Sequence, residues 1–521
     1  MDNKIIVNTK LGKVQGYRAG IEKYLSSFTS PGVIKFKGIP YAEPPINELR
    51  FRPPFPKKPW EGTLDATKFG PIAPRPEFLY KLPGLHYEQS EAECLNLNIW
   101  TPNIGGELRP VMVWIHGGGF FTDSGVHFEN SNLALRGNIV IVTINYRLGP
   151  LGFLYIPDET ANVGLLDQIA AIKWVKENIQ AFGGDPNNIT IFGQLAGAIS
   201  VCILLTMPAA KNLFQRVIAQ SGPPLPADFK PSSRIEATNN LMRNLGVKSG
   251  NIEDLRKIRT EKITEVHSEL LKSMDILDYL SFNLPYFGPV IEKNTLPTHP
   301  LEKFKKGFES DSEFLIGSNL DEATTYTATD PNLAMIDDKT LVKQTQIYLS
   351  ALDKNINLAD KLINLYKNIS GKRKLNTPRK VFDAICSDYA FRIPSILYAE
   401  LHSRFQKKSY MYLFNWRNPL ENGKYGATHA LEVPFMFGNL PEKDERLHIF
   451  PKKNEITERL SNNMMDYWVS FARNGNPNCE GLSKWPSYRA DKRSTMTFDT
   501  KSKVINAPFE YERFAWKDLL Y

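Results

Sequence analysis

Short runs of consecutive apolar residues mark the central part of the chain. The segments Val111–Ile115, Ile139–Ile144 and Ile189–Phe192 consist of apolar or β-branched residues and lack the alternation of a half-exposed strand. A strand that is buried on both faces of a sheet requires such a run. The three segments are therefore predicted to be central parallel strands.

A helical period lies between the second and third of these runs. From Leu166 to Ala181, the apolar residues Ile169, Ile172, Val175 and Ile179 recur at spacings of three and four. Strand, helix and strand in this order imply right-handed crossovers and a parallel or mixed sheet with helices on both faces. The predicted fold class is α/β.

The ends of the central region have a different pattern. The first hundred residues favour short strands and turns, with Gly12–Gly16 and Pro53–Pro59 as breaks. Residues 230–380 are more helical and richer in charge, and they are predicted to be an insertion over the site. Because no internal repeat or low-complexity linker divides the chain, residues 1–521 are predicted to form a single domain.

Composition and charge narrow the class of protein. With 42% hydrophobic and 23% charged residues, the chain is typical of a globular protein with a large core. The net charge of +8 is small for 521 residues, so nucleic acid is not an expected partner. One basic stretch is predicted to be a solvated helix–loop face, and it contains Lys367, Lys372, Arg373, Lys374, Arg379 and Lys380.

The termini and cysteines predict a cytoplasmic protein without a membrane partner. Residues 1–7 lack the apolar core of a secretory signal, and no run of about 18 apolar residues could span a bilayer. The four cysteines are too few for a disulfide framework and form no C-x-x-C pair. Free thiols are therefore expected at Cys94, Cys202, Cys386 and Cys479.

The segment Phe192–Gly197 has the pattern of a nucleophile elbow, G-x-S-x-G, with one departure. It stands where a buried strand ends and an apolar helix, Ala198–Met207, is predicted to begin. In such an elbow a sharp strand-to-helix turn holds the central residue in strained backbone geometry. The central residue here is Leu195, preceded by Gln194.

A glycine-rich loop upstream gives this spacing a context. Two glycines separated by three residues are weak evidence alone, but His116–Phe120 (His-Gly-Gly-Gly-Phe) follows the strand Val111–Ile115. Such a loop supplies backbone N–H groups to an oxyanion, and glycine lets them approach a substrate closely. Gly118 and Gly119 are the candidate donors.

Several further motifs resemble those of the type-B carboxylesterase family, which includes the cholinesterases. The resemblance covers nearly the whole chain and implies an α/β-hydrolase fold, ester hydrolysis by a Ser–Glu–His triad, no cofactor, and a small apolar ester or xenobiotic as ligand. The motifs are Phe36–Ala42, Glu48–Phe51, Cys94–Asn98, Asn145–Gly149, Phe182–Pro186 and Trp468–Pro477.

The resemblance also assigns the remaining site residues. Gly317–Glu322 is similar to the acid motif and gives the acid role to Glu322, with Asp321 as a rival. Gly426–Glu432 is similar to the histidine motif and gives the base role to His429. Together with Gly118 and Gly119, Ala196 completes the implied oxyanion hole.

No metal is predicted. The other histidines show neither H-E-x-x-H nor Cys-His ligand spacing. They are His86, His127, His267, His299, His402 and His448.

Leucine at position 195 predicts an inactive hydrolase, because it has no oxygen with which to attack an ester. On the following helix, Ser200 and Cys202 would lie roughly 7 and 10 Å further along the axis, too far to replace it. Loss of a serine nucleophile typically costs roughly 10⁶ in turnover. Leucine in the elbow also implies backbone strain of about 1 to 3 kcal/mol.

Three interpretations follow from the resemblance. The first is an inactive or inactivated carboxylesterase. An inactivated insect-type detoxifying or hormone esterase is one form of it, since Gln194 resembles the G-Q-S-A-G form of juvenile-hormone esterases. The second is a ligand-sequestering protein. The third, an adhesion protein of the neuroligin kind, predicts a signal and a membrane segment, which are not found. Residues 61–99 lack the tryptophan that binds choline, and Ala73 replaces the cysteine expected to pair with Cys94.

Overall fold

The computed structural model describes most of the chain. It covers residues 3–520 except 21–22, 25–26, 29–31, 77–86, 128, 226–228, 275–286, 308–310, 353, 369–372, 374 and 442–449. The basic residues Lys372 and Lys374 therefore lie outside the described residues.

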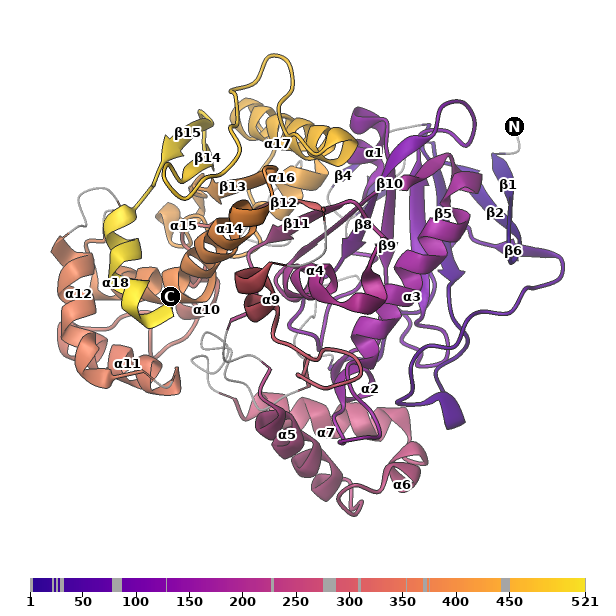
Figure 1. The fold of residues 1–521 in the computed structure, drawn as a ribbon, viewed down its shortest axis with the longest axis horizontal. Coiled ribbons are helices and arrows are strands. Elements are labelled where there is room, and N and C mark those ends of the chain that lie inside the picture. Colours follow the sequence, from indigo (N-terminus) through magenta and orange to yellow (C-terminus); the bar gives the residue numbers. More distant parts are fainter. Residues whose placement is uncertain are drawn as a thin grey trace.

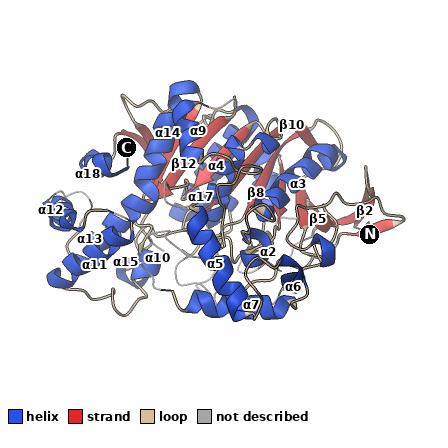
Figure 2. Ribbon diagram, turned by 60° about the horizontal axis from the view of Figure 1, so that its bottom comes forward, coloured by secondary structure: helices blue, strands red, loops and turns tan. Residues whose placement is uncertain are grey.

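A large twisted sheet runs through the molecule (Figures 1 and 2). Its strand order is β1-β2-β5-β7-β9-β8-β10-β11-β12-β13-β14-β15, and β6 pairs with β2. The strands are β1 (Lys4–Thr9), β2 (Gly12–Arg18), β5 (Ile34–Pro40), β6 (Thr63–Asp65), β7 (Asn96–Thr101), β8 (Arg109–Ile115), β9 (Val140–Ile144), β10 (Gly184–Gln194), β11 (Arg216–Gln220), β12 (Glu313–Asn319), β13 (Ser409–Phe414), β14 (Ser494–Phe498) and β15 (Lys503–Asn506). A separate hairpin pairs β3 (Lys23–Tyr24) with β4 (Ser27–Phe28).

The middle of the sheet is parallel, as the apolar runs predicted. From β9 through β8, β10, β11, β12 and β13 to β14, every neighbouring pair is parallel, whereas β7 and β15 join antiparallel. Parallel strands carry their carboxyl ends to one edge of the sheet, where α/β enzymes place their sites.

Helices cover both faces of the sheet (Figure 2). The apolar side chains of the central strands divide between the two faces. In β8, Val111 and Val113 join one buried apolar cluster, while Met112 and Trp114 join the other. The first cluster includes side chains of α3 (Val163–Asn178), α4 (Ala196–Thr206), α9 (Pro300–Lys306) and α14 (Ile393–Phe405). The second includes side chains of α1 (Ser131–Gly137), α16 (Val433–Phe437) and α17 (Glu455–Asn474). Burial on both faces explains the unbroken apolar runs.

The remaining helices lie at the periphery. In Figure 1, α5 (Pro231–Asn244), α6 (Ile252–Arg256) and α7 (Thr260–Lys272) protrude below the sheet, and α11 (Asp338–Ala351), α12 (Ala359–Asn368) and α18 (Glu510–Leu520) lie at the C-terminal side. Shorter elements are α2 (Gly149–Phe153), α10 (Thr324–Thr327), α13 (Pro378–Ser387) and α15 (Leu420–Gly423).

Two sequence-based expectations are wrong. Residues 230–380 are not one insertion, because β12 lies within this interval and pairs with β11 and β13 in the middle of the sheet. The sequence prediction missed this strand, because the segments around it in the sequence are helical and rich in charge. Arg373 is not on a solvated face either: it is buried, pairs with Asp388 at 2.9 Å, and donates to the carbonyl oxygen of Leu320.

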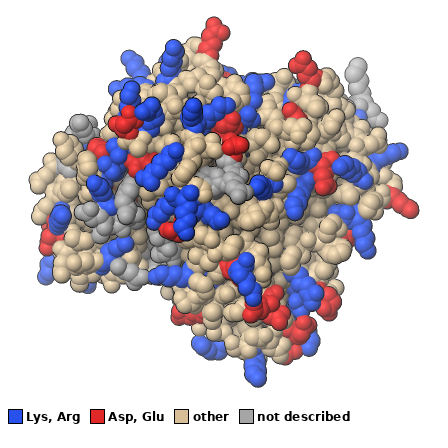
Figure 3. Space-filling view, viewed as in Figure 1, with Lys and Arg blue, Asp and Glu red and all other residues tan. Residues whose placement is uncertain are grey.

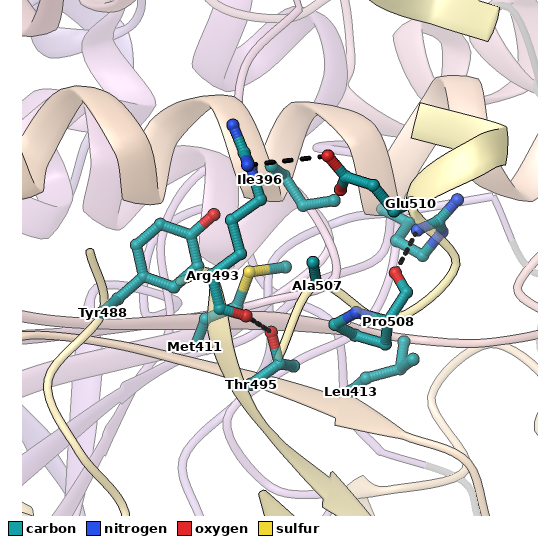
Figure 4. Close-up of a pocket in the computed structure, with 10 residues that line it drawn as sticks. Ile396, Met411, Leu413, Tyr488, Arg493, Thr495, Ala507, Pro508 and Glu510 are labelled. Atoms are coloured by element: carbon teal, nitrogen blue, oxygen red, sulfur yellow. Dashed lines mark hydrogen bonds and ion pairs between the residues drawn. The ribbon is translucent and has the colours of Figure 1, made fainter. Parts of the chain in front are cut away.

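A small cavity near the C-terminus is lined by paired charges (Figure 4). Arg493 forms ion pairs with Glu400 at 2.8 Å and with Glu510 of α18 at 3.5 Å. Arg392 donates to the carbonyl oxygen of Pro508. These contacts join α18 and the segment before it to Arg392 and Arg493.

Three further expectations concern cysteines, charge and membranes. All four cysteines are free, and Cys94 and Ala73 are both buried. On the face seen in Figure 3, basic and acidic side chains are interspersed. Within the described part of the chain, no helix is both long and apolar enough to cross a membrane.

Candidate active site

The strand-to-helix turn expected at residue 195 is present. β10 ends at Gln194, α4 begins at Ala196, and Leu195 between them has φ 52° and ψ −114°. Its N–H donates to the carbonyl oxygen of Gln220 at 3.0 Å, and its carbonyl oxygen accepts from the N–H of Ile199 at 2.8 Å. A β-carbon makes this backbone region unfavourable, so the leucine is held there by the bonds on both sides of it.

The two glycines of the elbow are required by close backbone approach. A Cβ added at Gly197 would lie 2.0 Å from the carbonyl oxygen of Ile115, and one added at Gly193 would lie 2.6 Å from the same atom. No side chain fits at either position. The glycine spacing therefore reflects the packing of α4 against β8 and is not accidental.

The glycine-rich loop after β8 lies beside this turn. Gly118 and Gly119 have φ of 79° and 62°, and a Cβ at Gly118 would lie 2.2 Å from the carbonyl oxygen of Thr122. The carbonyl oxygen of Gly118 accepts from Phe121 and Thr122, which tightens the loop. The positive φ at both positions favours glycine, which has no β-carbon to clash.

The amides assigned to the oxyanion hole have no acceptor within the described residues. The N–H groups of Gly118, Gly119 and Ala196 donate to no protein atom there. Gly118, Gly119 and Leu195 are partly exposed although their neighbours are buried. Ala196 itself is fully buried, so the partly exposed surface at the turn comes from Gly118, Gly119 and Leu195. Backbone amides without an acceptor are what an oxyanion hole needs.

Glu322 and His429 meet as the family pattern implies. The Nδ1 of His429 lies 2.5 Å from Oε2 of Glu322, and Oε1 of Glu322 accepts the N–H of Asn319 at 2.7 Å. Glu322 is fully buried and His429 is nearly so. The rings of Phe391 and Tyr326 pack on the imidazole, with centroids 5.2 and 5.8 Å away. A carboxylate bonded to Nδ1 leaves Nε2 as the nitrogen that faces the reaction.

The rival acid is turned away from His429. Asp321 accepts the N–H of Ala427 at 3.0 Å and lies 3.5 Å from the guanidinium of Arg417. It thus braces the loop that carries the histidine without touching the ring. Glu322 alone has the geometry of the acid.

The alternative nucleophiles are also placed elsewhere. Ser200 and Cys202 are fully buried on α4, and Oγ of Ser200 accepts a hydrogen bond from Gln168 at 3.1 Å. Burial raises the pKa of the Cys202 thiol, which disfavours the thiolate. Neither side chain replaces the missing hydroxyl.

A second buried carboxylate was not singled out from the sequence. Glu432 lies three residues after His429, accepts from Nδ2 of Asn319 at 2.7 Å, and accepts from Nε2 of Gln220 at 3.3 Å. Burial and the nearby charge of Glu322 raise the pKa of Glu432 to about 7. Its place in the histidine motif was the only available signal, because Asn319 and Gln220 are far away in the chain.

Gln194 was noted only as a variant of the family motif, but it touches the histidine. Its Nε2 lies 2.8 Å from Nε2 of His429. Gln194 is buried, and no sequence pattern indicated that the elbow and the histidine loop meet through this amide. Leu195 offers no polar atom at this place.

Metal ligation finds no support in the described residues. Nowhere in that part of the chain do three or more His, Cys, Asp or Glu side chains gather so that they could hold a metal ion. His86 and His448 lie outside it. Burial lowers the pKa of His116 to about 4 and that of His267 to about 3, so both are neutral packing residues near neutral pH.

Comparison with known proteins agrees with this geometry. The model of the Carboxylesterase family matches residues 3–515. Para-nitrobenzyl esterase of Bacillus subtilis (strain 168) is 36% identical over 98% of this chain and 97% of its own length. Phenmedipham hydrolase of Pseudarthrobacter oxydans is 35% identical over 89% of this chain and 91% of its own. A solved thermophilic pNB esterase superposes with a TM-score of 0.83, at 34% identity, over 98% of this chain and 99% of that one.

Proposed function

The chain belongs to the carboxylesterase family, whose chemistry is the hydrolysis of carboxylic esters, and from this premise we propose that it binds small apolar esters without forming an acyl-enzyme. The observation that carries the proposal is Leu195 at the point of the elbow where the family reaction needs a hydroxyl. A leucine side chain has no lone pair with which to attack a carbonyl carbon.

The other parts of the reaction have their residues. An ester carbonyl oxygen at the elbow would accept from the amides of Gly118, Gly119 and Ala196, which are otherwise without acceptors in the described chain. Glu322 would orient His429 through Nδ1, and Nε2 would move the proton. No cofactor enters this scheme.

Hydrolysis by a water molecule is a remaining route at this site. His429 would have to activate the water, and the oxyanion amides would stabilise the tetrahedral intermediate. In a serine hydrolase without its triad, about 10³ to 10⁴ over the uncatalysed rate remains, which is roughly 10⁶ below the intact enzyme. We therefore propose that the chain is not an ordinary esterase.

The retained site favours an inactivated esterase over a protein that evolved to sequester ligands. Glu322, His429 and the oxyanion loop keep catalytic geometry that simple sequestration does not need. Serine and leucine codons can differ by one base, so a single change accounts for the sequence. The natural ligands would then belong to the ester class that detoxifying or hormone esterases hydrolyse.

The test is Leu195→Ser, assayed with p-nitrophenyl and naphthyl esters beside the parent. We expect a rise of at least about 10³ in kcat/KM, from the size of nucleophile effects in triad enzymes. Leu195→Ala is the matched control, because it removes the leucine side chain without adding an oxygen, and it should stay at the parent rate. Leu195→Ser/His429→Ala should lose the gain.

The activity of Leu195→Ser distinguishes an inactivated esterase from a ligand-sequestering protein. A folded Leu195→Ser protein with no gain in rate would contradict the proposal and favour ligand sequestration. A gain that Leu195→Ala shares would contradict it too, because the hydroxyl would then not be the cause.

A further inference from the structure

Gln194 lies between the glycine-rich loop and the histidine. Its Nε2 is 2.8 Å from Nε2 of His429, and a Cβ added at Gly117 would lie 3.1 Å from its Oε1. The side chain is 7% exposed. The amide is therefore wedged between the two parts of the site and cannot turn freely into solvent.

The proton positions follow from the partners of the imidazole. Glu322 presents Oε2 to Nδ1 of His429 at 2.5 Å, and a carboxylate accepts hydrogen bonds, so Nδ1 carries a hydrogen. In a neutral imidazole the other nitrogen is then an acceptor. The amide of Gln194 can donate, and the assignment that satisfies both groups has its N–H donating to Nε2 of His429.

In the pair formed by Glu322 and His429, the reacting atom is Nε2 of His429, which takes up a proton through its lone pair. In the triad mechanism it receives the proton of the nucleophile, and in the water route it would receive a proton from water. A hydrogen bond from Gln194 occupies this lone pair. Leu195, the next residue, cannot compete for it.

We propose that Gln194 is a positioning residue that replaces the missing hydroxyl as the hydrogen-bond partner of His429 Nε2. Its hydrogen bond keeps a water molecule from reaching this nitrogen. The inference rests on the role of His429 as the base in the proposed function. The chain has then lost its nucleophile and also free access to its base. A buried amide needs a partner, and the imidazole is the one that the fold provides.

The proposal predicts how His429 reacts with diethyl pyrocarbonate, which is attacked by an imidazole nitrogen with a free lone pair. Gln194→Met keeps the length of the side chain and removes the donor. We expect carbethoxylation of His429 to become about tenfold faster, a factor in keeping with loss of one hydrogen bond. Mass spectrometry of the tryptic peptide 425–443 measures it, because that peptide contains His429 and no other histidine.

Gln168→Met is the matched control. Gln168 is also a buried glutamine that donates to a side chain, Oγ of Ser200, but it does not touch His429. His429 in this variant should react at the parent rate. Equal rates in parent and Gln194→Met, or equal acceleration in both variants, would overturn the proposal.

A measurement on the unmodified chain covers the case in which Gln194→Met does not fold. With ¹⁵N-labelled histidine, NMR should find Nδ1 of His429 protonated and Nε2 unprotonated and hydrogen-bonded near neutral pH. A protonated Nε2 would overturn the proposal. Neither readout needs serine at 195, so an inactive Leu195→Ser protein with a shielded His429 would contradict the proposed function and leave this inference standing.

Discussion

The two halves of the candidate site differ in how well their residues suit their surroundings. In the acid–base half, both oxygens of Glu322 accept hydrogen bonds, and Asn319 links Glu322 to Glu432. In the elbow half, the backbone has the strained geometry of a nucleophile turn, but the side chain of Leu195 has no oxygen to present there. The comparison teaches that the absence of a nucleophile comes down to one side chain, because the backbone turn that would position a hydroxyl is intact.

The largest expected effect in the acid–base half is on Glu322. In the Leu195→Ser background, Glu322→Gln should lower kcat by roughly 10⁴, because an amide no longer fixes the tautomer of His429 or stabilises its charged form. Asp321→Asn is the matched control, since Asp321 is the adjacent carboxylate and faces Arg417. Steady-state kinetics measure both, and equal losses would remove the distinction between the two acids.

The second prediction concerns Glu432 and the pH dependence of the free energy of unfolding. Its pKa is raised from 4.5 to about 7 in the fold by burial and by Glu322. The folded chain therefore binds more protons than the unfolded one between these values, so this group's contribution to stability is full below pH 4.5 and falls as pH rises toward 7. The loss of unfolding free energy amounts to at most about 3.5 kcal/mol, at about 1.4 kcal/mol per pKa unit.

Glu432→Gln has no carboxyl to titrate, and it keeps an oxygen that can accept from Asn319. Its unfolding free energy, measured in urea from pH 4.5 to 7.5, should decline less than that of the parent over this interval. Parallel pH profiles for the two proteins would show that Glu432 titrates normally in the fold.

The smallest effect concerns strain in the elbow half. Leu195→Gly and Leu195→Ala both remove the leucine packing, but only glycine suits φ 52° and ψ −114°. We expect the glycine variant to be more stable than the alanine variant by about 1 kcal/mol or more. Urea denaturation measures the difference, and a more stable alanine variant would mean that the turn carries no strain.

The sequence predicted those parts of the fold that depend on local pattern. The runs Val111–Ile115 and Ile139–Ile144 became β8 and β9 almost residue for residue, because burial on both faces demands unbroken apolar segments. β10 begins earlier than its apolar run, at Gly184, because this residue pairs with Arg109 before an irregular stretch that ends at Ile189. The burial of β12 and Arg373 was missed, because both depend on neighbours distant in the chain.

The same limit applies to the site. Glu322 and His429 were found through motifs, and the elbow glycines through their spacing. Gln194 and Glu432 touch the dyad through contacts that span hundreds of residues or depend on Asn319, and no period or motif in one sequence encodes such contacts. The sequence thus predicted candidate reacting groups and missed the polar side chains that contact them.

The most direct test of the central claim is the covalent reaction itself. Parent and Leu195→Ser proteins would be treated with excess paraoxon, an organophosphate, and weighed intact by mass spectrometry. Phosphylation needs the same oxygen nucleophile as acylation, so we expect no adduct on the parent and one adduct per chain on Leu195→Ser, within residues 193–197. An adduct on the parent that maps to those residues would contradict the account.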